Sequence, residues 1–226
     1  MFSSPTSAVS KGERTRARLR DLALTSFRER GYDATTVRLV ASEAGVSVGT
    51  VNAHFPTKNH LVQELYLKVQ IAHRDAAEPL LADASDLIDR LDAVYRTGLD
   101  QLAPYHPHAH EFLSAAVSPR SPINPLSDDS AEALGIVDAL FADAVTGAKR
   151  GGVPEEFRAT LPAALTLAHL LLALYWVYDR SPGQQKTRTL LARGLKLLRA
   201  ALPLMRVPVL RAPLRELLAL VAEVRA

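Results

Sequence analysis

The stretch that decides the fold is ATTVRLVASEAGVSVGTVNAHF, which runs from Ala34 to Phe55. Its apolar residues between Val37 and Ala44 recur at the i, i+3, i+4, i+7 spacing of one helix face. Gly45 follows, at a point where a turn between two helices needs a residue that tolerates positive φ. A second short helix comes next, so the spacing is that of a helix-turn-helix whose second helix can enter a major groove. The spacing alone leaves an ordinary helical hairpin as the alternative.

Helix-start and helix-stop signals predict further helices on both sides of this stretch. Ser10 and Glu13 have the spacing of a capping box that starts a helix at Lys11, and Gly31 ends that helix. The two helices of the stretch cover 37–44 and 47–55, and Thr35 or Thr36 caps the first. Later helices are expected near 58–77, 84–103, 106–117, 129–149, 154–179, 185–202 and 211–225, with a proline-rich loop at 118–130.

These elements predict an all-α protein with no convincing strand. We expect a flexible tail at 1–10, a three-helix helix-turn-helix domain at 11–57, and a larger helical domain at 58–226. Apolar residues make up 48% of the 226 residues, which is enough for a real core. The chain has no cysteine, which excludes disulfides and thiolate metal sites.

Positive charge is concentrated in the first third of the chain. Residues 1–66 hold nine Lys/Arg and six Asp/Glu, which accounts for the whole net charge of +3. Such a cluster suggests a polyanion as partner, although a solvated helix face is the simpler alternative. The N-terminus has no features of a signal peptide, so a cytoplasmic protein is expected.

The run GYDATTVRLVASEAGVSVGTVNAHFPTKNHLVQELY, residues 31–66, resembles the DNA-binding domain of the tetracycline-repressor (TetR) family of transcriptional regulators. The resemblance is close over about 11–66, and beyond that it is one of length and helical character. It implies a homodimer that binds a palindromic double-stranded DNA operator, most simply as a repressor. It also implies a C-terminal domain that binds a small hydrophobic or aromatic effector.

The resemblance further implies a set of DNA contacts, in which basic residues and helix N-termini meet phosphates and the second helix of the motif faces bases. The expected DNA-binding residues are Arg14, Arg16, Arg18, Thr35, Thr36, Arg38, Ser47, Val48, Gly49, Thr50, Asn52, His54 and Lys58. The family usually has Tyr where this chain has Asn52. Asn can pair with adenine N6 and N7, or it can simply face solvent.

The segment LPAALTLAHLLLALYWVY, residues 161–178, is apolar nearly all round. At 18 residues it is at the low end for a membrane span, and it carries Pro162, Thr166 and His169, so we expect a buried helix and no membrane. Its faces suggest a ligand pocket and a dimer seam. Expected pocket residues, each of which could instead belong to a filled core, are Tyr95, Leu99, Phe112, Ala116, Val137, Leu140, Phe141, His169 and Trp176. Expected dimer-interface residues are Leu170, Leu174, Leu191, Gly194, Leu195, Leu198 and Leu202.

The motif YHPHAHE at 105–111 leaves three interpretations open. His106, His108 and His110 with Glu111 could bind a divalent metal, line a polar pocket mouth, or form a surface turn. A metal-responsive regulator is therefore one alternative function. A helical ligand-binding protein that no longer binds DNA is another. No Ser/His/Asp set, phosphate loop or HExxH helix occurs, so neither catalysis nor a cofactor is expected.

Overall fold

The structure, a computed structural model of the chain, describes residues 10–225. It confirms the predicted all-α class, because residues 10–225 contain no strand and only an isolated β-bridge between Asp86 and Arg150. The predicted tail at 1–10 lies outside the described residues except for Ser10.

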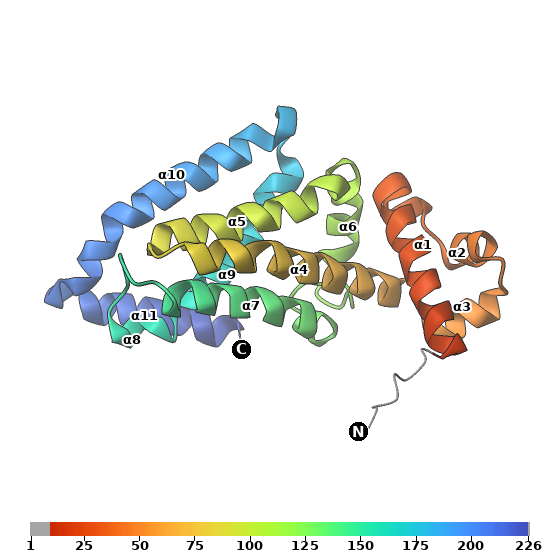
Figure 1. Cartoon of the computed structure of the whole chain (residues 1–226), viewed down its shortest axis with the longest axis horizontal. Helices are drawn as coiled ribbons and strands as arrows, with labels where there is room; N and C mark the ends of the chain where they lie inside the picture. The colour runs from red at the N-terminus through yellow and green to blue at the C-terminus, as the bar shows by residue number, and fades with distance from the viewer. Residues whose placement is uncertain (1–9, 226) are drawn as a thin grey trace, which may run out of the picture.

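The helices fall into an N-terminal group and an elongated body (Figure 1). The N-terminal group comprises α1 (Lys11–Ala34), α2 (Val37–Ala44) and α3 (Val48–His54). The body comprises α4 (Lys58–Asp83), α5 (Leu87–Leu102), α6 (Ala109–Ala116), α7 (Ala131–Thr146), α8 (Glu155–Arg158), α9 (Leu161–Tyr178), α10 (Gln185–Ala201) and α11 (Pro208–Arg225). Short 3-10 helices link them: η1 (Ala103–His108), η2 (Asp128–Ser130), η3 (Pro182–Gln184) and η4 (Leu202–Arg206). Helices α2 and α3 lie at one end of the molecule, and α1 lies between them and the body (Figure 1).

Local capping chemistry fixes the N-terminal helices. Ser10 and Glu13 form the predicted capping box at the start of α1. Thr36, rather than Thr35, caps α2 by accepting a hydrogen bond from the Leu39 N–H at 3.1 Å. Gly45 ends α2 with φ of 63°, a left-handed conformation that suits glycine.

The N-terminal core does not stop at α3. Phe27, Val51 and Phe55 are fully buried with Leu61 and Val62 of α4 in one continuous cluster. That cluster also takes in Phe112 and Ala116 of α6 and Ile123 of the following loop. The start of α4 and α6 therefore belong to the body by position but contribute side chains to the core of the N-terminal group.

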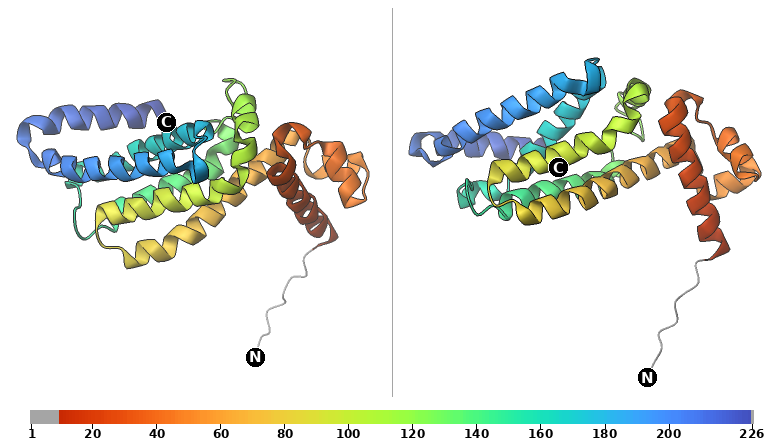
Figure 2. Two further views of the ribbon diagram at one scale, coloured as in Figure 1. Left: turned by 90° about the horizontal axis from the view of Figure 1, so that it is seen from above. Right: turned by 45° about the horizontal axis from the view of Figure 1, so that its top comes forward.

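The body is a layered bundle in which α4, α5, α7 and α9 surround a second apolar core (Figure 2). Arg90 of α5 is buried at one end of this bundle. Its guanidinium donates to the carbonyl oxygens of Leu81 and Ala84 at the C-terminal end of α4 and to those of Asp143 and Ala144 in the last turn of α7. The side chain thus binds carbonyl groups at the C-termini of two helices, where intrahelical partners run out.

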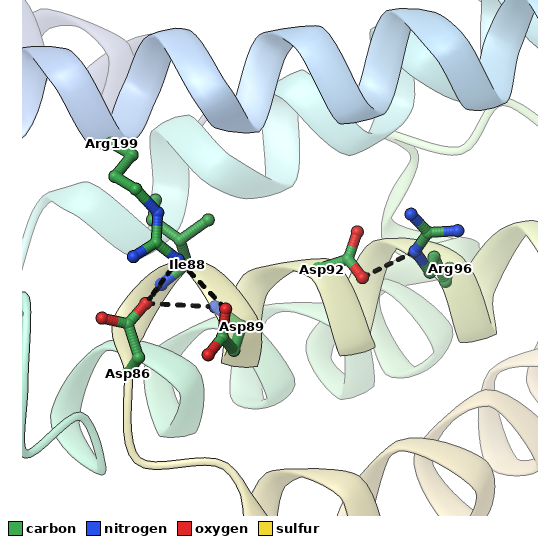
Figure 3. A network of polar contacts seen from close by, with 6 residues as sticks. All are labelled: Asp86, Ile88, Asp89, Asp92, Arg96 and Arg199. Carbon is green, nitrogen blue, oxygen red and sulfur yellow. Dashed lines mark hydrogen bonds and ion pairs between the residues drawn. The ribbon is translucent and has the colours of Figure 1, made fainter.

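Helices α10 and α11 form the outer part of the body. Arg199 of α10 bridges to Asp86 at 2.9 Å and to Asp89 at 3.0 Å, at the start of α5 (Figure 3). Asp86 also caps α5 by accepting from the Ile88 N–H, so one carboxylate both starts α5 and holds α10. Helix α11 then runs back against α9, with Leu218 buried between them.

The observed helix boundaries differ from the predicted ones by a few residues in several places, and three differences involve a proline. Helix α4 continues to Asp83 with Pro79 inside it. The predicted helix at 154–179 is divided into α8 and α9, because Pro162 sits in the first turn of α9, where a missing N–H costs nothing. The predicted helix at 106–117 begins as η1, which contains Pro107.

Helix α9 is the one helix among residues 10–225 that is long and apolar enough to cross a membrane by length and composition. In the structure it packs against α7, α10 and α11. Thr166 and His169 of α9 are buried inside the chain, and the Thr166 hydroxyl donates to Asp138 of α7 at 2.6 Å. One face of α9 is thus packed inside the chain, while Leu171, Tyr175 and Tyr178 of the same helix are exposed.

Candidate functional site

The outer face of α3 offers a short exposed helix end. Ser47 caps it by accepting from the Thr50 N–H at 3.1 Å, and the two hydroxyls lie 3.0 Å apart. Val48 is 39% exposed, and Gly49 and Asn52 are also exposed, whereas Val51 on the opposite face is fully buried. The helix is thus anchored on one side and free to enter a groove on the other.

Basic side chains flank this helix. Arg38 of α2 and Arg14 and Arg18 of α1 are exposed, and within residues 10–225 none of the three forms an ion pair. Thr36 stands at the N-terminus of α2, where backbone N–H groups favour an anion. His54, at the end of α3, is half-buried. Together these residues form an exposed, basic face around α3, and their role in DNA binding stays a prediction.

Three of the expected DNA-binding residues are engaged within the chain. Thr35 is fully buried, and its hydroxyl donates to the Gly31 carbonyl at 2.7 Å, so the predicted phosphate contact of this hydroxyl is wrong. The guanidinium of Arg16 pairs with Glu64 and lies over the Phe55 ring. The ammonium of Lys58 lies 3.6 Å from the centroid of the Tyr32 ring, and burial lowers its pKa. A phosphate would have to compete with these internal partners for Arg16 and Lys58.

A partly open cavity of about 430 Å³ lies in the body between α4, α6, α7 and α9, and the exposed Val117 and Leu126 stand on its wall. Loop residues Asn124–Leu126 form part of its wall, and the Tyr66 hydroxyl holds this loop to α4 by donating to the Ile123 carbonyl at 3.0 Å. No Asp, Glu, Lys or Arg occurs among the described residues that line the cavity. Its size and apolar wall suit a small organic ligand.

The structure brings five of the nine expected pocket residues to the cavity wall: Phe112, Ala116, Val137, His169 and Trp176. The other four, Tyr95, Leu99, Leu140 and Phe141, pack in the core instead. The Tyr95 hydroxyl, for example, donates to the Leu165 carbonyl at 3.0 Å, so its hydrogen bond is made inside the bundle. The expectation that they line the pocket is therefore corrected.

Sequence reasoning missed the contribution of α4 to the cavity. Leu65, Tyr66, Val69 and Gln70 all line it from that helix. Their i, i+1, i+4, i+5 spacing marks an apolar helix face, but nothing in the sequence tells a face against a cavity from a face against a filled core.

A cluster of contacts joins the cavity to the N-terminal domain. The ring of Phe112 lines the cavity and also packs edge-to-face on Phe27 and Tyr32 of α1, with centroids 5.5 Å away in each case. Next to it, a carboxylate oxygen of Glu111 accepts from the Asp33 N–H at 2.8 Å. Burial raises the pKa of Glu111, but hydrogen bonds from Asp33 and His108 outweigh it and hold the pKa below the ordinary value.

Backbone geometry adapts α1 to this junction. Gly31 has φ of 84°, and a Cβ atom there would lie 2.5 Å from the Glu111 carboxylate and 2.6 Å from His108 Nδ1. A glycine is therefore required both by the backbone conformation and by the close approach of α6.

Two models of one family match this chain. The model of bacterial regulatory proteins of the tetR family matches residues 19–65, and that of the tetracyclin repressor-like C-terminal domain matches residues 90–221. The chain belongs to the TetR family of bacterial transcriptional regulators. The resemblance found at residues 31–66 is thereby confirmed.

Curated relatives match only part of this TetR-family regulator. An uncharacterized HTH-type transcriptional regulator of Mycobacterium tuberculosis is 43% identical over 63 residues, which are 26% of this chain and 30% of the relative. The repressor KstR2 of the same organism is 32% identical over 98 residues, which are 40% of this chain and 46% of KstR2. The chain spans less than half the length of either relative.

Solved structures share the fold over most of the chain. A tetR-family regulator from Streptomyces coelicolor has a TM-score of 0.60 and 20% identity, covering 84% of this chain and 83% of the other. FadR of Thermus thermophilus, solved in complex with lauroyl-CoA, has a TM-score of 0.56 and 21% identity, covering 79% and 94%. At these identities the likeness concerns the fold.

The expected dimer-interface residues of this TetR-family regulator fall on three different surfaces. Leu191 and Leu195 are each 6% exposed because they face the core of their own subunit, and Leu198 and Leu202 pack partly against the same core. Leu170 and Leu174 line the cavity. Gly194 alone lies on the open face of α10, where an added Cβ would meet no atom within 4 Å.

The open face of α10 carries a different apolar stripe. Leu190, Gly194, Leu197 and Ala201 are exposed at i, i+4, i+7, i+11, and Leu197 is 71% exposed. Helix α9 exposes Leu171, Tyr175 and Tyr178 at a similar spacing. We call these seven residues the α9–α10 stripe. An apolar surface of this kind is typical of a protein–protein contact.

The histidines at 105–111 do not converge. His106 Nε2 donates to the Trp176 carbonyl at 3.0 Å, whereas His108 Nδ1 pairs with Glu111 at 2.9 Å. His110 is exposed. Among the described residues no group of three or more His, Asp or Glu side chains is placed to hold a metal ion. Since His106 and His108 anchor η1 and α6, the surface-turn interpretation describes only His110.

Proposed function

We propose that this TetR-family regulator is a cytoplasmic, ligand-responsive repressor that binds a palindromic operator as a homodimer. The observation that carries the proposal is the position of Phe112, whose ring belongs both to the wall of an uncharged cavity and to the aromatic cluster of α1. A ligand in the cavity therefore acts on the same side chain that supports the DNA-binding domain.

The DNA-binding part of the proposal rests on α3 and its basic surroundings. Val48, Thr50 and Asn52 present methyl groups and one amide toward a major groove, and Arg38 and Arg14 meet phosphates on either side. In a dimer the two copies of α3 would have to be spaced by about one helical turn of DNA, ~34 Å.

The regulatory part requires the effector to prefer one domain arrangement. A ligand shifts an equilibrium only by its differential affinity for the two states. An effector that moves α6 changes the packing of Phe112 on α1 and the Glu111–Asp33 hydrogen bond, and so changes the spacing of the two α3 helices. We expect a small hydrophobic or aromatic effector, and the complex of T. thermophilus FadR with lauroyl-CoA supports ligand binding in a related fold.

The homodimer is proposed to form through the α9–α10 stripe. Pairing two copies would cover these apolar side chains and leave α9 buried on all sides, as its composition predicts. A four-helix contact made by α9 and α10 of each subunit would result.

The test uses the full-length protein and the DNA upstream of its own gene in a gel shift at several salt concentrations. Arg38→Ala should weaken binding to all sequences alike and reduce the log–log salt slope by roughly one unit, because one phosphate contact is lost. Lys149→Ala, which removes an exposed charge in the loop after α7, serves as the matched control and should leave the slope unchanged.

An unchanged slope in Arg38→Ala would remove Arg38 from the interface. Absence of any sequence-dependent shift, on this DNA or in a genomic selection, would favour the alternative of a ligand-binding protein that no longer binds DNA. Release of the operator by an apolar ligand would support the repressor model.

A further inference from the structure

The inner wall of the cavity indicates the chemistry of the effector, and this inference rests on the cavity being the effector site proposed above. His169 of α9 lies on this wall and is 4% exposed. Its Nδ1 atom is buried and has no hydrogen-bond partner among the described residues. Since buried polar atoms in folded proteins are nearly always paired, the ring has bonding capacity that the described residues do not use.

The His169 ring is held in place by three neighbouring helices. It stacks on His73 of α4 with centroids 5.8 Å apart, and Phe141 of α7 meets it at 6.0 Å. On α5, a Cβ atom at Gly98 would lie 2.7 Å from its Cε1 atom, so only glycine leaves room for the ring there. The ring is therefore oriented before any ligand binds, which reduces the entropy cost of a specific contact.

The side-chain amide of Gln70 is a second polar group on the cavity wall, and its contact with His73 bears on its orientation. His73 Nε2 lies 2.8 Å from the Val94 carbonyl, which can only accept, so this nitrogen carries the proton. In the neutral ring Nδ1 is then an acceptor, and the side-chain amide of Gln70 lies 3.1 Å from it. The structure places the Gln70 Oε1 atom at this distance, and exchanging the oxygen and nitrogen of that amide lets Nδ1 accept from the NH₂ group. In either orientation the Gln70 amide keeps one polar atom for other partners, and Gln70 also lines the cavity.

The cavity offers nothing to balance a formal charge. No acidic or strongly basic side chain lies among its described lining residues. His169 itself is neutral at ordinary pH, because burial and the nearby His73 lower its pKa to about 3. A carboxylate placed here would be buried without a counter-ion, which is strongly unfavourable.

We propose that the part of the effector held in this cavity is uncharged and mainly apolar, and carries one carbonyl or hydroxyl oxygen that hydrogen-bonds to the ring of His169. A neutral imidazole donates to a carbonyl or accepts from a hydroxyl, according to its tautomer. The Gln70 amide is a second polar group at this end. The apolar remainder lies along the side chains of Val69, Phe112 and Val137.

The test measures displacement of the neutral dye N-phenyl-1-naphthylamine from the full-length protein at pH 8. The four competitors are 2-decanone, 1-decanol, decane and sodium decanoate, which share a chain length and differ in the polar group. Hydrophobic transfer alone would rank decane first, because it is the most apolar. We expect 2-decanone and 1-decanol to displace the dye at about three- to tenfold lower concentration than decane, the size of one net hydrogen bond, and decanoate to be weakest.

Two variants and one control examine the residue. His169→Phe keeps an aromatic ring and removes the hydrogen bond, so 2-decanone should lose its advantage and decane should bind as before. His169→Gln keeps a polar group and should retain the preference in part. His60→Phe makes the same change at an exposed position of α4 and should leave all four values unchanged. The ranking on the unmodified protein tests the proposal even where a variant fails to fold.

The failure of this inference is distinct from that of the proposed function. If decane ranks first on the unmodified protein, or decanoate equals 2-decanone, the polar assignment is overturned while the cavity remains an effector site. If His169→Phe keeps the preference for 2-decanone, another group hydrogen-bonds to the ligand oxygen and the assignment to His169 is wrong. If neither the dye nor any competitor binds, both proposals fail together.

Discussion

The DNA-binding surface and the cavity are built in opposite ways. The surface comes from one continuous stretch, in which Thr36, Gly45 and Ser47 each fix a helix end through contacts within a few residues. The cavity comes from α4, α6, α7 and α9, and its polar end depends on Gly98 of α5 making room for His169. A locally coded surface can be recognised from its sequence, whereas a cavity assembled from distant segments cannot.

The largest expected effect comes from a substitution that prevents dimerisation. Leu197→Arg places a charge in the α9–α10 stripe, where pairing with a second copy would leave it buried and unpaired. We expect monomers and a loss of operator affinity of at least about 100-fold, because one half-site must then carry all binding. Sedimentation and gel shift measure the two effects.

Ala192→Arg is the matched control for this substitution. It adds the same side chain to an exposed position of α10 outside the stripe and should leave the dimer intact. A stable dimer of Leu197→Arg that still binds the operator would place the interface on another face.

The next effect concerns the junction where the two regions meet. Gly31→Ala adds a Cβ at positive φ and against the Glu111 carboxylate, and should lower the free energy of unfolding by about 1–3 kcal/mol. Gly135→Ala in α7 adds the same methyl where nothing lies within 4 Å, and should raise it by about 0.5–1 kcal/mol. Urea unfolding at one protein concentration compares the pair. If both substitutions changed the free energy of unfolding in the same direction, the junction would not be tightly packed.

The pH dependence of stability separates the body from the DNA-binding domain. The folded pKa of His169 is about 3, below its ordinary value of 6.5, so the unfolded chain binds more protons as pH falls through 6.5. This contribution to stability is present above pH 6.5 and is lost on acidification, by about 2 kcal/mol at pH 5. His169→Phe should flatten that slope, although His73, whose pKa burial also lowers, keeps part of it. His60→Phe should keep the full slope, and a full slope in His169→Phe would contradict the assignment.

The smallest effect is confined to one base pair. Asn52 is the side chain of exposed α3 that can make a paired donor–acceptor contact, and adenine is its geometric match. Asn52→Ala should remove the adenine preference at one position of each half-site, about 1–3 kcal/mol of discrimination, and leave the other positions alone. Asn52→Tyr should keep or raise affinity without that preference. A randomised-operator selection with the three proteins gives the answer, and identical logos for the native protein and Asn52→Ala would mean that Asn52 faces solvent.

Much of the fold could be predicted because helix signals are short-range. The capping box at Ser10, the glycine stop at Gly45 and the spacing between Val37 and Ala44 all act within one or two helical turns. The sequence did not show that some predicted contact residues have a second, internal partner. Thr35 is buried against Gly31, and Arg16 pairs with Glu64, which lies 48 residues further on. On α10, Leu191 and Leu195 were predicted for the dimer interface but face the core of their own subunit, because Leu191 and the exposed Leu190 are equally apolar in sequence.

The sequence by itself determined the helices, the helix-turn-helix and the family, since each depends on residue types at fixed local spacing. Only the tertiary structure decided which apolar faces line a cavity, which fill the core and which stay open. Apolar burial is non-directional, and the same leucine satisfies any of the three. What distinguishes them here is the packing of helices far apart in sequence, which places His169 on the cavity wall and leaves Leu197 in solvent.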